Sequence, residues 1–241
     1  MVLLKKSRGR KNLLIKGVKQ EVGSSYRKHL FQCGLLHLKS EDNLWKNFDR
    51  SVRKNINKAT SNKLVVKKDN SIHSLRKFFY PLYLEEMKKF GTPPHSLNYF
   101  LLLKKHFRNK LKVYYTLNKD NHFTAALLGL GCGKNFYIAY NPSIPKYLSE
   151  RPNDILHWEM IKNTNDEGYK YFDFGPLGYK GQYQFKIKWG IQLIDYFQYS
   201  NSPIKEQPIY FRTVFASFWK YGIPTNLSKH IGHFFRKWLA F

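Results

Sequence analysis

The chain has 241 residues, of which 42% are hydrophobic, so it is long enough to bury a core in one large domain or two small ones. Its 42 Lys and Arg residues against 16 Asp and Glu residues give a formal net charge of +26. This excess excludes polycationic partners and favours RNA, DNA, an anionic membrane surface or a phosphate-rich substrate. Codon bias in an AT-rich genome, which enriches Lys, Asn and Tyr, is the competing explanation for part of the charge.

The cysteines and the apolar runs exclude two further classes of protein. Cys33 and Cys132 are far apart in the sequence, so we expect no disulfide framework, no zinc-ligand set and a reducing compartment. No apolar run reaches the length of about 18 residues that a membrane span needs, and residues 1–19 are basic without the apolar core of a signal peptide. We therefore expect a cytoplasmic protein that could touch the inner membrane face, and no metal site.

Residues 1–30 alternate short apolar pairs with basic clusters, which predicts a basic extension or the remnant of a first domain. A short strand is expected at 33–40, followed by a basic amphipathic helix that begins after Ser40 and buries Trp45, Phe48, Val52 and Ile56. A strand over 63–68 and helices over 71–90 and 96–107 come next, and Pro81 is expected to kink the first of these helices.

The middle of the chain predicts a meander of three antiparallel strands with the sequences LKVYYTL, HFTAALLGLG and NFYIAY. A helix capped by Asn153 and ended by Gly168 follows, then strands over 169–174 and 191–200. Two basic aromatic helices, at about 207–221 and 226–239, complete the chain. This order predicts an α+β domain over 31–205, with a mixed and mostly antiparallel central sheet flanked by helices, and a separate basic C-terminal segment over 206–241.

Several common motifs are absent from the sequence. There is no G-x-S-x-G, no G-x-x-x-x-G-K-[ST] and no H-E-x-x-H, and the glycines of GLGCGK lie between two strands, whereas a dinucleotide fingerprint opens a helix. His230 and His233 are three residues apart without a neighbouring carboxylate, so surface or phosphate contact is favoured over metal binding. The pattern excludes the common hydrolase and nucleotide-binding classes.

The stretch YKYFDFGPLGYKGQYQFKIKWG combines glycines with a single carboxylate and a lysine between aromatic residues. Asp173 ends an apolar strand, where it either hydrogen-bonds to the turn at Gly175 or lies in a cleft; Gly175 itself permits positive φ and close approach of the backbone. Phe185 and Trp189 are expected to hold Lys186 in place, and a fixed cation can neutralise a phosphate or a developing oxyanion. The alternative is an ordinary surface lysine.

Four segments carry a resemblance to a known family: WKNFDRSVRKNINKA, LYLEEMKKFGTPPHSLNYFLLLKKHF, AYNPSIPKYLSERPNDILHWEMIKNTNDEGYKYFDFG and GQYQFKIKWG. They resemble FemAB-type proteins, which are GNAT-fold acyltransferases related to the enzymes that add amino acids to peptidoglycan cross-bridges, and FemAB-like proteins of exopolysaccharide and PEP-CTERM gene neighbourhoods. The resemblance runs from about residue 34 to residue 199, and its DFG…FKxxWG ending is the most specific part. It implies a GNAT-like domain, usually the second of two in tandem, whereas this chain has room for one.

The resemblance also implies roles for individual residues. It places Phe185 and Lys186 near the reacting acyl group, so we expect Lys186 to stabilise charge on the donor or the oxyanion, and Asp173 or Glu159 to orient or deprotonate the acceptor amine. A helix-face acid in solvent is the alternative for Glu159, and core packing is the alternative for the aromatic residues. The predicted substrate-binding residues are Phe185, Tyr137, Tyr140, Trp158, Gly175 and Trp189.

Two candidates remain for the acyl donor, aminoacyl-tRNA and acyl-CoA. No tightly bound cofactor is expected. The segment KYLSERPNDIL lacks the glycine-rich pyrophosphate loop of acetyl-CoA-dependent relatives, which favours aminoacyl-tRNA. The positive charge suits tRNA and equally an anionic glycan or lipid-linked precursor. We therefore expect an N-acyltransferase that transfers an acyl or aminoacyl group to an amine of a cell-envelope or exopolysaccharide precursor. The alternatives are a non-catalytic RNA- or membrane-binding module on a GNAT scaffold and an acetyl-CoA-dependent sugar-amine acetyltransferase.

Overall fold

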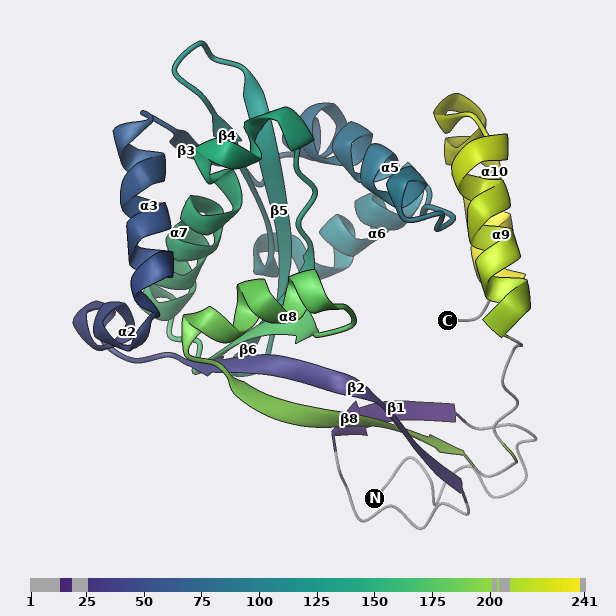
Figure 1. The fold of residues 1–241 in the computed structure, drawn as a ribbon, viewed down its shortest axis with the longest axis horizontal. Coiled ribbons are helices and arrows are strands. Elements are labelled where there is room, and N and C mark those ends of the chain that lie inside the picture. The colour runs from purple at the N-terminus through teal and green to yellow at the C-terminus, as the bar shows by residue number, and fades with distance from the viewer. Residues whose placement is uncertain (1–13, 19–25, 201–202, 204–208, 239–241) are drawn as a thin grey trace.

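One mixed sheet of eight strands, in the order β1-β8-β2-β7-β6-β5-β4-β3, organises the protein in a computed structural model that describes residues 14–18, 26–200, 203 and 209–238 (Figure 1). Neighbouring strands are antiparallel except for β6 and β7, which are parallel. The predicted α+β class with a mostly antiparallel central sheet is thereby confirmed. The strands are β1 (Leu14–Val18), β2 (Tyr26–His37), β3 (Val65–Lys68), β4 (Leu111–Leu117), β5 (Phe123–Cys132), β6 (Asn135–Tyr140), β7 (Tyr171–Pro176) and β8 (Gln192–Ser200).

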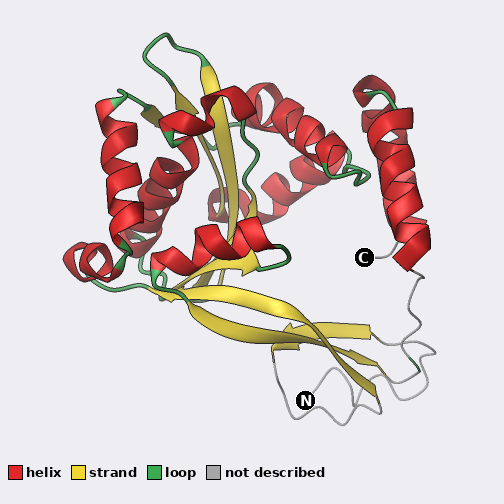
Figure 2. Cartoon of the chain, in the orientation of Figure 1, coloured by secondary structure: helices red, strands yellow, loops and turns green. Residues whose placement is uncertain are grey.

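Helices cover both faces of the sheet, with α3 and α7 on one side and α5 and α6 on the other (Figures 1 and 2). The α-helices are α2 (Glu41–Asn47), α3 (Arg50–Ser61), α4 (Ile72–Ser74), α5 (Tyr80–Lys89), α6 (Leu97–Phe107), α7 (Pro152–Asp166), α8 (Lys180–Lys186), α9 (Ile209–Gly222) and α10 (Thr225–Trp238). A π-helical turn η1 (Leu75–Phe79) and three 3-10 turns, η2 (Arg108–Lys110), η3 (Pro145–Glu150) and η4 (Ile187–Trp189), complete the elements. None of the helices in the described ranges has the length and hydrophobicity that a membrane crossing requires.

The core is divided between the two faces of the sheet. Tyr114 of β4 and Leu127 of β5 pack with α2, α3 and α7, whereas their neighbours Val113 and Leu128 pack with α5 and α6. Because both faces are covered by helices, most successive residues of β4 and β5 are buried, and burial does not alternate along these strands.

Two predicted helices are interrupted. The helix expected to continue past residue 48 divides into α2 and α3 because Asp49 caps α3, with its Oδ1 accepting a hydrogen bond from the Ser51 backbone N–H at 2.7 Å. In the second helix, the predicted disturbance at Pro81 takes the form of the π-helical turn η1 immediately before α5. Proline has no N–H to donate, so the preceding turn is free to widen.

The helix before β7 begins earlier than its predicted cap. The prediction that Asn153 caps this helix is wrong, since α7 already begins at Pro152. The Asn153 side chain instead accepts a hydrogen bond from Asn141 at 3.2 Å and donates one to Ser143 at 3.4 Å, which ties α7 to the segment after β6. The expected terminating glycine is present, because Gly168 has a φ of +81°.

The ends of the chain extend the sheet on one side and add two helices on the other. The boundary expected at residue 31 falls within β2, and β1 lies inside the segment predicted as an extension, where it pairs with β8. Residues 1–13 and 19–25 lie outside the described residues, as do residues 207, 208 and 239 of the predicted terminal helices. The helices α9 and α10 stand next to α5 at the edge of the molecule (Figure 1).

Candidate active site

The candidate site lies where the only parallel strand pair of the described sheet separates. Three residues of β6 pair with three of β7, ending at Tyr137 opposite Asp173, although both strands continue for three residues beyond this point. Gly175 turns the chain of β7 with a φ of +73°, and its backbone N–H donates to Asp173 Oδ1 at 2.7 Å. The predicted hydrogen bond between Asp173 and this turn is therefore present, and it orients the carboxylate at the end of the paired region.

Glycine is required at position 175 for two reasons. The positive φ disfavours residues with a β-carbon, and a β-carbon at this position would lie 3.3 Å from Cε2 of Tyr137. The ring of Tyr137 thus covers the Gly175 backbone, and its side chain is 37% exposed. Burial, followed by the charge of Asp173, raises the pKa of Tyr137 to about 12, so the phenol keeps its proton at neutral pH and can donate a hydrogen bond.

Lys186 is the last residue of α8 and reaches back to the end of β7. Its Nζ donates to the backbone carbonyl of Pro176 at 2.8 Å. Burial lowers the pKa of Lys186 from 10.5 to about 8, while the negative charge of Asp173 opposes this change. The segment is helical throughout, because α8 is followed directly by the 3-10 turn η4. The site therefore contains one fixed ammonium group whose proton is less tightly held than that of an exposed lysine.

The pKa values of the carboxylate and of the thiol near Lys186 are both shifted upward by burial. Burial raises the pKa of Asp173, against the opposing effects of the Gly175 N–H and the Lys186 charge. Cys33 lies on β2 in register with Pro176 and is 8% exposed; burial and the Asp173 charge raise the pKa of its thiol to about 12. A protonated thiol is a poor nucleophile, so the cluster favours chemistry without a covalent enzyme intermediate.

A cluster of rings packs around His157, and one of them belongs to Phe185, the residue before Lys186. His157 of α7 is buried, with its Nδ1 2.8 Å from the Asn153 carbonyl, and its ring stacks on Phe174 with the centroids 5.4 Å apart. Phe185 meets the same imidazole edge-on at 5.2 Å, and the Trp189 ring lies 5.8 Å away. Burial lowers the pKa of His157 to about 4, so the imidazole is neutral and does not repel the Lys186 ammonium.

Other predicted substrate-binding residues lie deeper in the fold or on the other face of the sheet. Trp189 is fully buried, and Trp158 packs in the core against Trp45 and Phe48 with centroid distances of 5.4 and 5.5 Å. Tyr140 belongs to the cluster on the α5 and α6 face, where its ring lies 4.9 Å from that of Tyr83. These positions fit the alternative of core packing.

The structure also separates Glu159 from Lys186. The Glu159 carboxylate pairs with Lys68 Nζ at 3.2 Å and with Lys162 Nζ at 2.6 Å. Burial raises the pKa of Glu159, but the two lysines outweigh this effect and hold the pKa below its usual value. Successive helical residues are turned by about 100°, so Glu159 and His157 point to opposite sides of α7. These ion pairs do not favour a role for Glu159 as a base.

One acidic residue with no predicted role lies beside the loop that leads into α8. Tyr179 of this loop packs on Phe90 with the ring centroids 6.1 Å apart, and Glu86 is one helical turn before Phe90 on α5. Burial raises the pKa of Glu86 to about 7. A carboxylate with a pKa near 7 has the proton affinity of a general base, although in the sequence it appears as an ordinary polar position in a helix.

A mixed sheet in which the pairing of the parallel strands β6 and β7 ends partway along both strands, with helices on both faces, is the arrangement of the GNAT fold. Residues 46–186 match the family model described as "Acetyltransferase (GNAT) domain". This match covers more than half of the chain, and the protein belongs to this family. The family match supports acyl transfer as the general activity, and the structural neighbours confirm the predicted FemAB-like GNAT fold.

Solved structures with the same fold differ strongly in sequence. A crystal structure of FemX is 15% identical with a TM-score of 0.63 and matches 82% of this chain and 68% of its own. A conserved protein of unknown function from Bacteroides thetaiotaomicron VPI-5482 (11% identity, TM-score 0.52) matches 83% and 65%, and L-PGS from Bacillus licheniformis (12%, TM-score 0.50) matches 83% and 68%. The chain thus spans about two thirds of the length of each structure. A search of curated proteins finds no match.

Proposed function

We propose that this protein is an N-acyltransferase that transfers an acyl or aminoacyl group to an amine of a cell-envelope or exopolysaccharide precursor. The observation that carries the proposal is the position of Lys186. Its ammonium is fixed 2.8 Å from the Pro176 carbonyl where β6 and β7 separate, beside the oriented Asp173 carboxylate. Oriented cations and hydrogen-bond donors of this kind stabilise the charge that develops during acyl transfer.

The reaction needs an amine, an activated carbonyl and a place for one proton. In the proposed mechanism the acceptor nitrogen attacks the carbonyl carbon of the donor, and the Lys186 ammonium stabilises the resulting oxyanion. Asp173 orients the attacking amine and accepts its proton. The tetrahedral intermediate then expels the ester oxygen or thioester sulfur of the donor, which takes up the proton held by Asp173 as it leaves, and the amide remains. No bond to the enzyme forms, in keeping with the raised pKa of the Cys33 thiol.

Aminoacyl-tRNA is the favoured donor in this proposal, with acyl-CoA as the second candidate. The segment before α7 is the 3-10 turn η3, followed by Arg151 in a left-handed conformation with a φ of +68°. This turn stands where acetyl-CoA-dependent relatives carry a glycine-rich loop, and it contains no glycine. The net charge of +26 suits a donor with many phosphates and an anionic glycan or lipid-linked acceptor. We place the reaction in the cytoplasm, where both donors are made.

The test compares donors and two neighbouring lysines. Purified protein is incubated with aminoacyl-tRNA or acyl-CoA and with amine-bearing peptidoglycan or glycan precursors, and the amide product is measured by mass spectrometry. We expect Lys186→Ala to lower kcat/KM by about 10²- to 10³-fold. Lys188→Ala removes an exposed lysine two residues away and should leave kcat/KM close to the wild-type value.

Three results would count against the proposal. Equal turnover by the Lys186→Ala variant would refute the role of this lysine. Salt-sensitive RNA binding without amide formation from either donor would replace the enzyme by a binding module on a GNAT scaffold. Saturable binding and turnover of acetyl-CoA alone would favour the sugar-amine acetyltransferase and exclude the preference for tRNA.

A further inference from the structure

The terminal helices α9 and α10 are fixed to the domain by their inner sides. Trp219 is fully buried and Ser228 is 1% exposed. The backbones approach closely, because a β-carbon on Gly91 would lie 2.2 Å from the Ala216 carbonyl oxygen and one on Gly232 would lie 2.5 Å from Cδ of Pro94. The two helices therefore hold a defined position next to the end of α5.

The outer sides of the same helices expose large apolar side chains. Val214, Phe218 and Tyr221 of α9 are 48%, 54% and 77% exposed, and their spacing of four and three residues places them on one face of the helix. On α10, Leu227 and Phe234 are 46% and 59% exposed and stand two turns apart on one side. Packing on α5 explains the inner residues of these helices and leaves the outer ones without an explanation.

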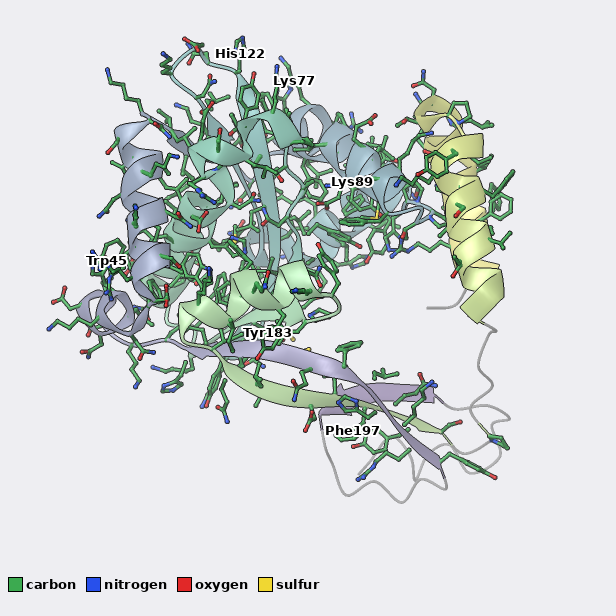
Figure 3. All side chains as sticks on the ribbon, viewed as in Figure 1. Trp45, Lys77, Lys89, His122, Tyr183 and Phe197 are labelled. Carbon is green, nitrogen blue, oxygen red and sulfur yellow. The ribbon has the colours of Figure 1, made fainter. Side chains whose placement is uncertain are left out.

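Basic groups accompany these apolar residues. The sequence after Glu206 contains no acidic residue, and Lys220 and Lys229 lie on the same two helices, whereas Arg236 points inward and donates to the Pro93 carbonyl at 2.7 Å. Lys220 Nζ lies 5.0 Å from the centroid of the neighbouring Tyr221 ring. From the opposite side, Lys89 at the end of α5 faces these helices (Figure 3). Lys89, Phe90, Lys220 and Tyr221 are among the residues that line an open cleft of about 670 Å³ between α5 and α9.

We propose that the outer side of α9 and α10, defined by Val214, Phe218, Tyr221, Leu227 and Phe234 with Lys220 and Lys229, docks the protein onto the surface of an anionic phospholipid bilayer. Aromatic and aliphatic side chains enter the boundary between headgroups and acyl chains, and lysines bind the lipid phosphates. Lys89 and Lys220 provide two cations for a headgroup at the mouth of the cleft.

Charge distinguishes the bilayer from other occupants of this surface. A second copy of the chain also carries a net charge of +26, so its approach would be repelled, whereas an anionic leaflet attracts the same surface. RNA would match the charge but would leave the aliphatic residues Val214 and Leu227 without a partner. The inference depends on these helices and the adjoining end of α5, and it holds for any acyl donor or acceptor.

The test is co-sedimentation of the full chain with phosphatidylcholine vesicles and with vesicles that also contain phosphatidylglycerol. We expect binding to the anionic vesicles, weak binding to the neutral ones, and a loss of binding as the salt concentration rises. The double variant Phe218→Ser/Tyr221→Ser should lower the vesicle partition coefficient about tenfold or more. Lys220→Glu should lower it on anionic vesicles only.

Two control variants change the same kinds of side chain elsewhere. Leu102→Ser removes an apolar side chain that is 46% exposed on α6, and Lys58→Glu makes the same charge change on α3. Both should bind anionic vesicles within about twofold of wild type if docking depends on α9 and α10. Melting temperatures confirm that each variant is folded, and acyl transfer from soluble substrates should be unchanged in the α9 variants.

Specific results would overturn the proposal. These are failure of the wild-type chain to bind anionic vesicles, or undiminished binding by the Phe218→Ser/Tyr221→Ser variant. Loss of a dimer in light scattering, or loss of RNA binding, in this variant without a change in vesicle binding would assign the surface to another occupant.

Discussion

The burial of the Lys186 ammonium predicts that removing it stabilises the protein while abolishing acyl transfer. Its pKa falls from 10.5 to about 8 on folding. Each pKa unit corresponds to about 1.4 kcal/mol, so the buried charge costs about 3 kcal/mol at neutral pH. Lys186→Met keeps the length of the side chain and removes this cost, but it also removes the hydrogen bond to Pro176, which is worth about 1 kcal/mol. The net gain expected at pH 7 is about 2 kcal/mol.

The pH dependence of this gain has a defined sign. Because the folded-state pKa lies below the unfolded-state value, the unfolded chain holds a proton on Lys186 that the folded chain releases between about pH 8 and 10.5. The cost is therefore fully present below pH 8 and disappears as the pH rises through 10.5. The variant should lose its advantage over the wild type by about pH 10.

Urea unfolding of Lys186→Met and wild type at pH 7 and pH 10 measures the gain in stability and its loss with rising pH. A thermal melt at pH 7 should show an increase of about 4–8 °C in Tm. Other groups titrate in this range, but their effects cancel in the difference between variant and wild type. Lys188→Met, on an exposed side chain of the same segment, serves as the control and should change stability little. A Lys186→Met variant that is less stable at pH 7, or a gain that is the same at both pH values, would refute the reasoning.

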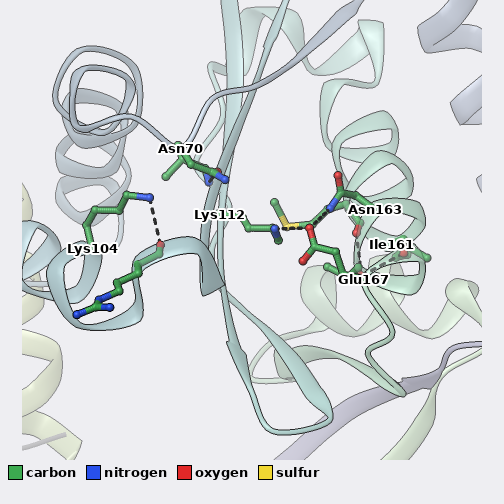
Figure 4. Close-up of polar contacts among 10 residues, drawn as sticks. Asn70, Lys104, Lys112, Ile161, Asn163 and Glu167 are labelled. Atoms are coloured by element: carbon green, nitrogen blue, oxygen red, sulfur yellow. Dashed lines mark hydrogen bonds and ion pairs between the residues drawn. The ribbon is translucent and has the colours of Figure 1, made fainter.

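Two further predictions concern backbone conformation and a buried charge. Gly175→Ala and Gly168→Ala both place alanine at positive φ, which should cost about 1–2 kcal/mol of stability each. Only at position 175 does the new β-carbon meet the Tyr137 ring, so only Gly175→Ala should also lower kcat/KM. Equal activity of the two variants would contradict this prediction. Lys112 is buried and its Nζ lies 2.5 Å from Glu167 Oε1 (Figure 4). Glu167→Gln should lower the free energy of unfolding by about 1–3 kcal/mol, and adding Lys112→Met should restore it. Urea unfolding of the single and the double variant measures both effects. A double variant as unstable as the single one would argue against the ion pair.

Local patterns were enough to predict most of the elements from sequence. The meander β4 to β6 and strand β7 follow from short apolar runs bounded by turn residues, and all of them lie close to the expected positions. The division of the first helix was also encoded locally, since Asp49 is a common N-cap residue, but the continuous apolar face across residues 45–56 concealed it. The strand β1 and the early start of β2 were missed because both pair with β8, more than a hundred residues further along the chain.

The candidate site likewise contains residues that the sequence indicated and residues that only the fold brings in. Asp173, Gly175 and Lys186 come from one continuous stretch, whose glycines and aromatic residues marked it in the sequence. Cys33 and His157 reach the same place only through the pairing of β2 with β7 and the packing of α7, so no local pattern indicated them. Periodicity separates residues on opposite faces of an element, but it does not tell which face meets a distant part of the chain. Glu159 and Tyr140 were grouped with the site for this reason.

The position of β8 between β1 and β2 has a consequence for the way the protein is made. Strand β2 pairs with β7 and β8, and β1 pairs with β8, so neither N-terminal strand completes its pairing until residues 192–200 have left the ribosome. At about 5–20 residues per second, synthesis of the roughly 150 intervening residues takes on the order of ten to thirty seconds. During this interval the edges of β2 are unpaired and could pair with other nascent chains. The basic residues around β2 repel the same residues of another nascent chain and so oppose this pairing. The part of β2 that carries Cys33 can join the site only near the end of translation, so fragments that stop before β8 should lack a completed sheet.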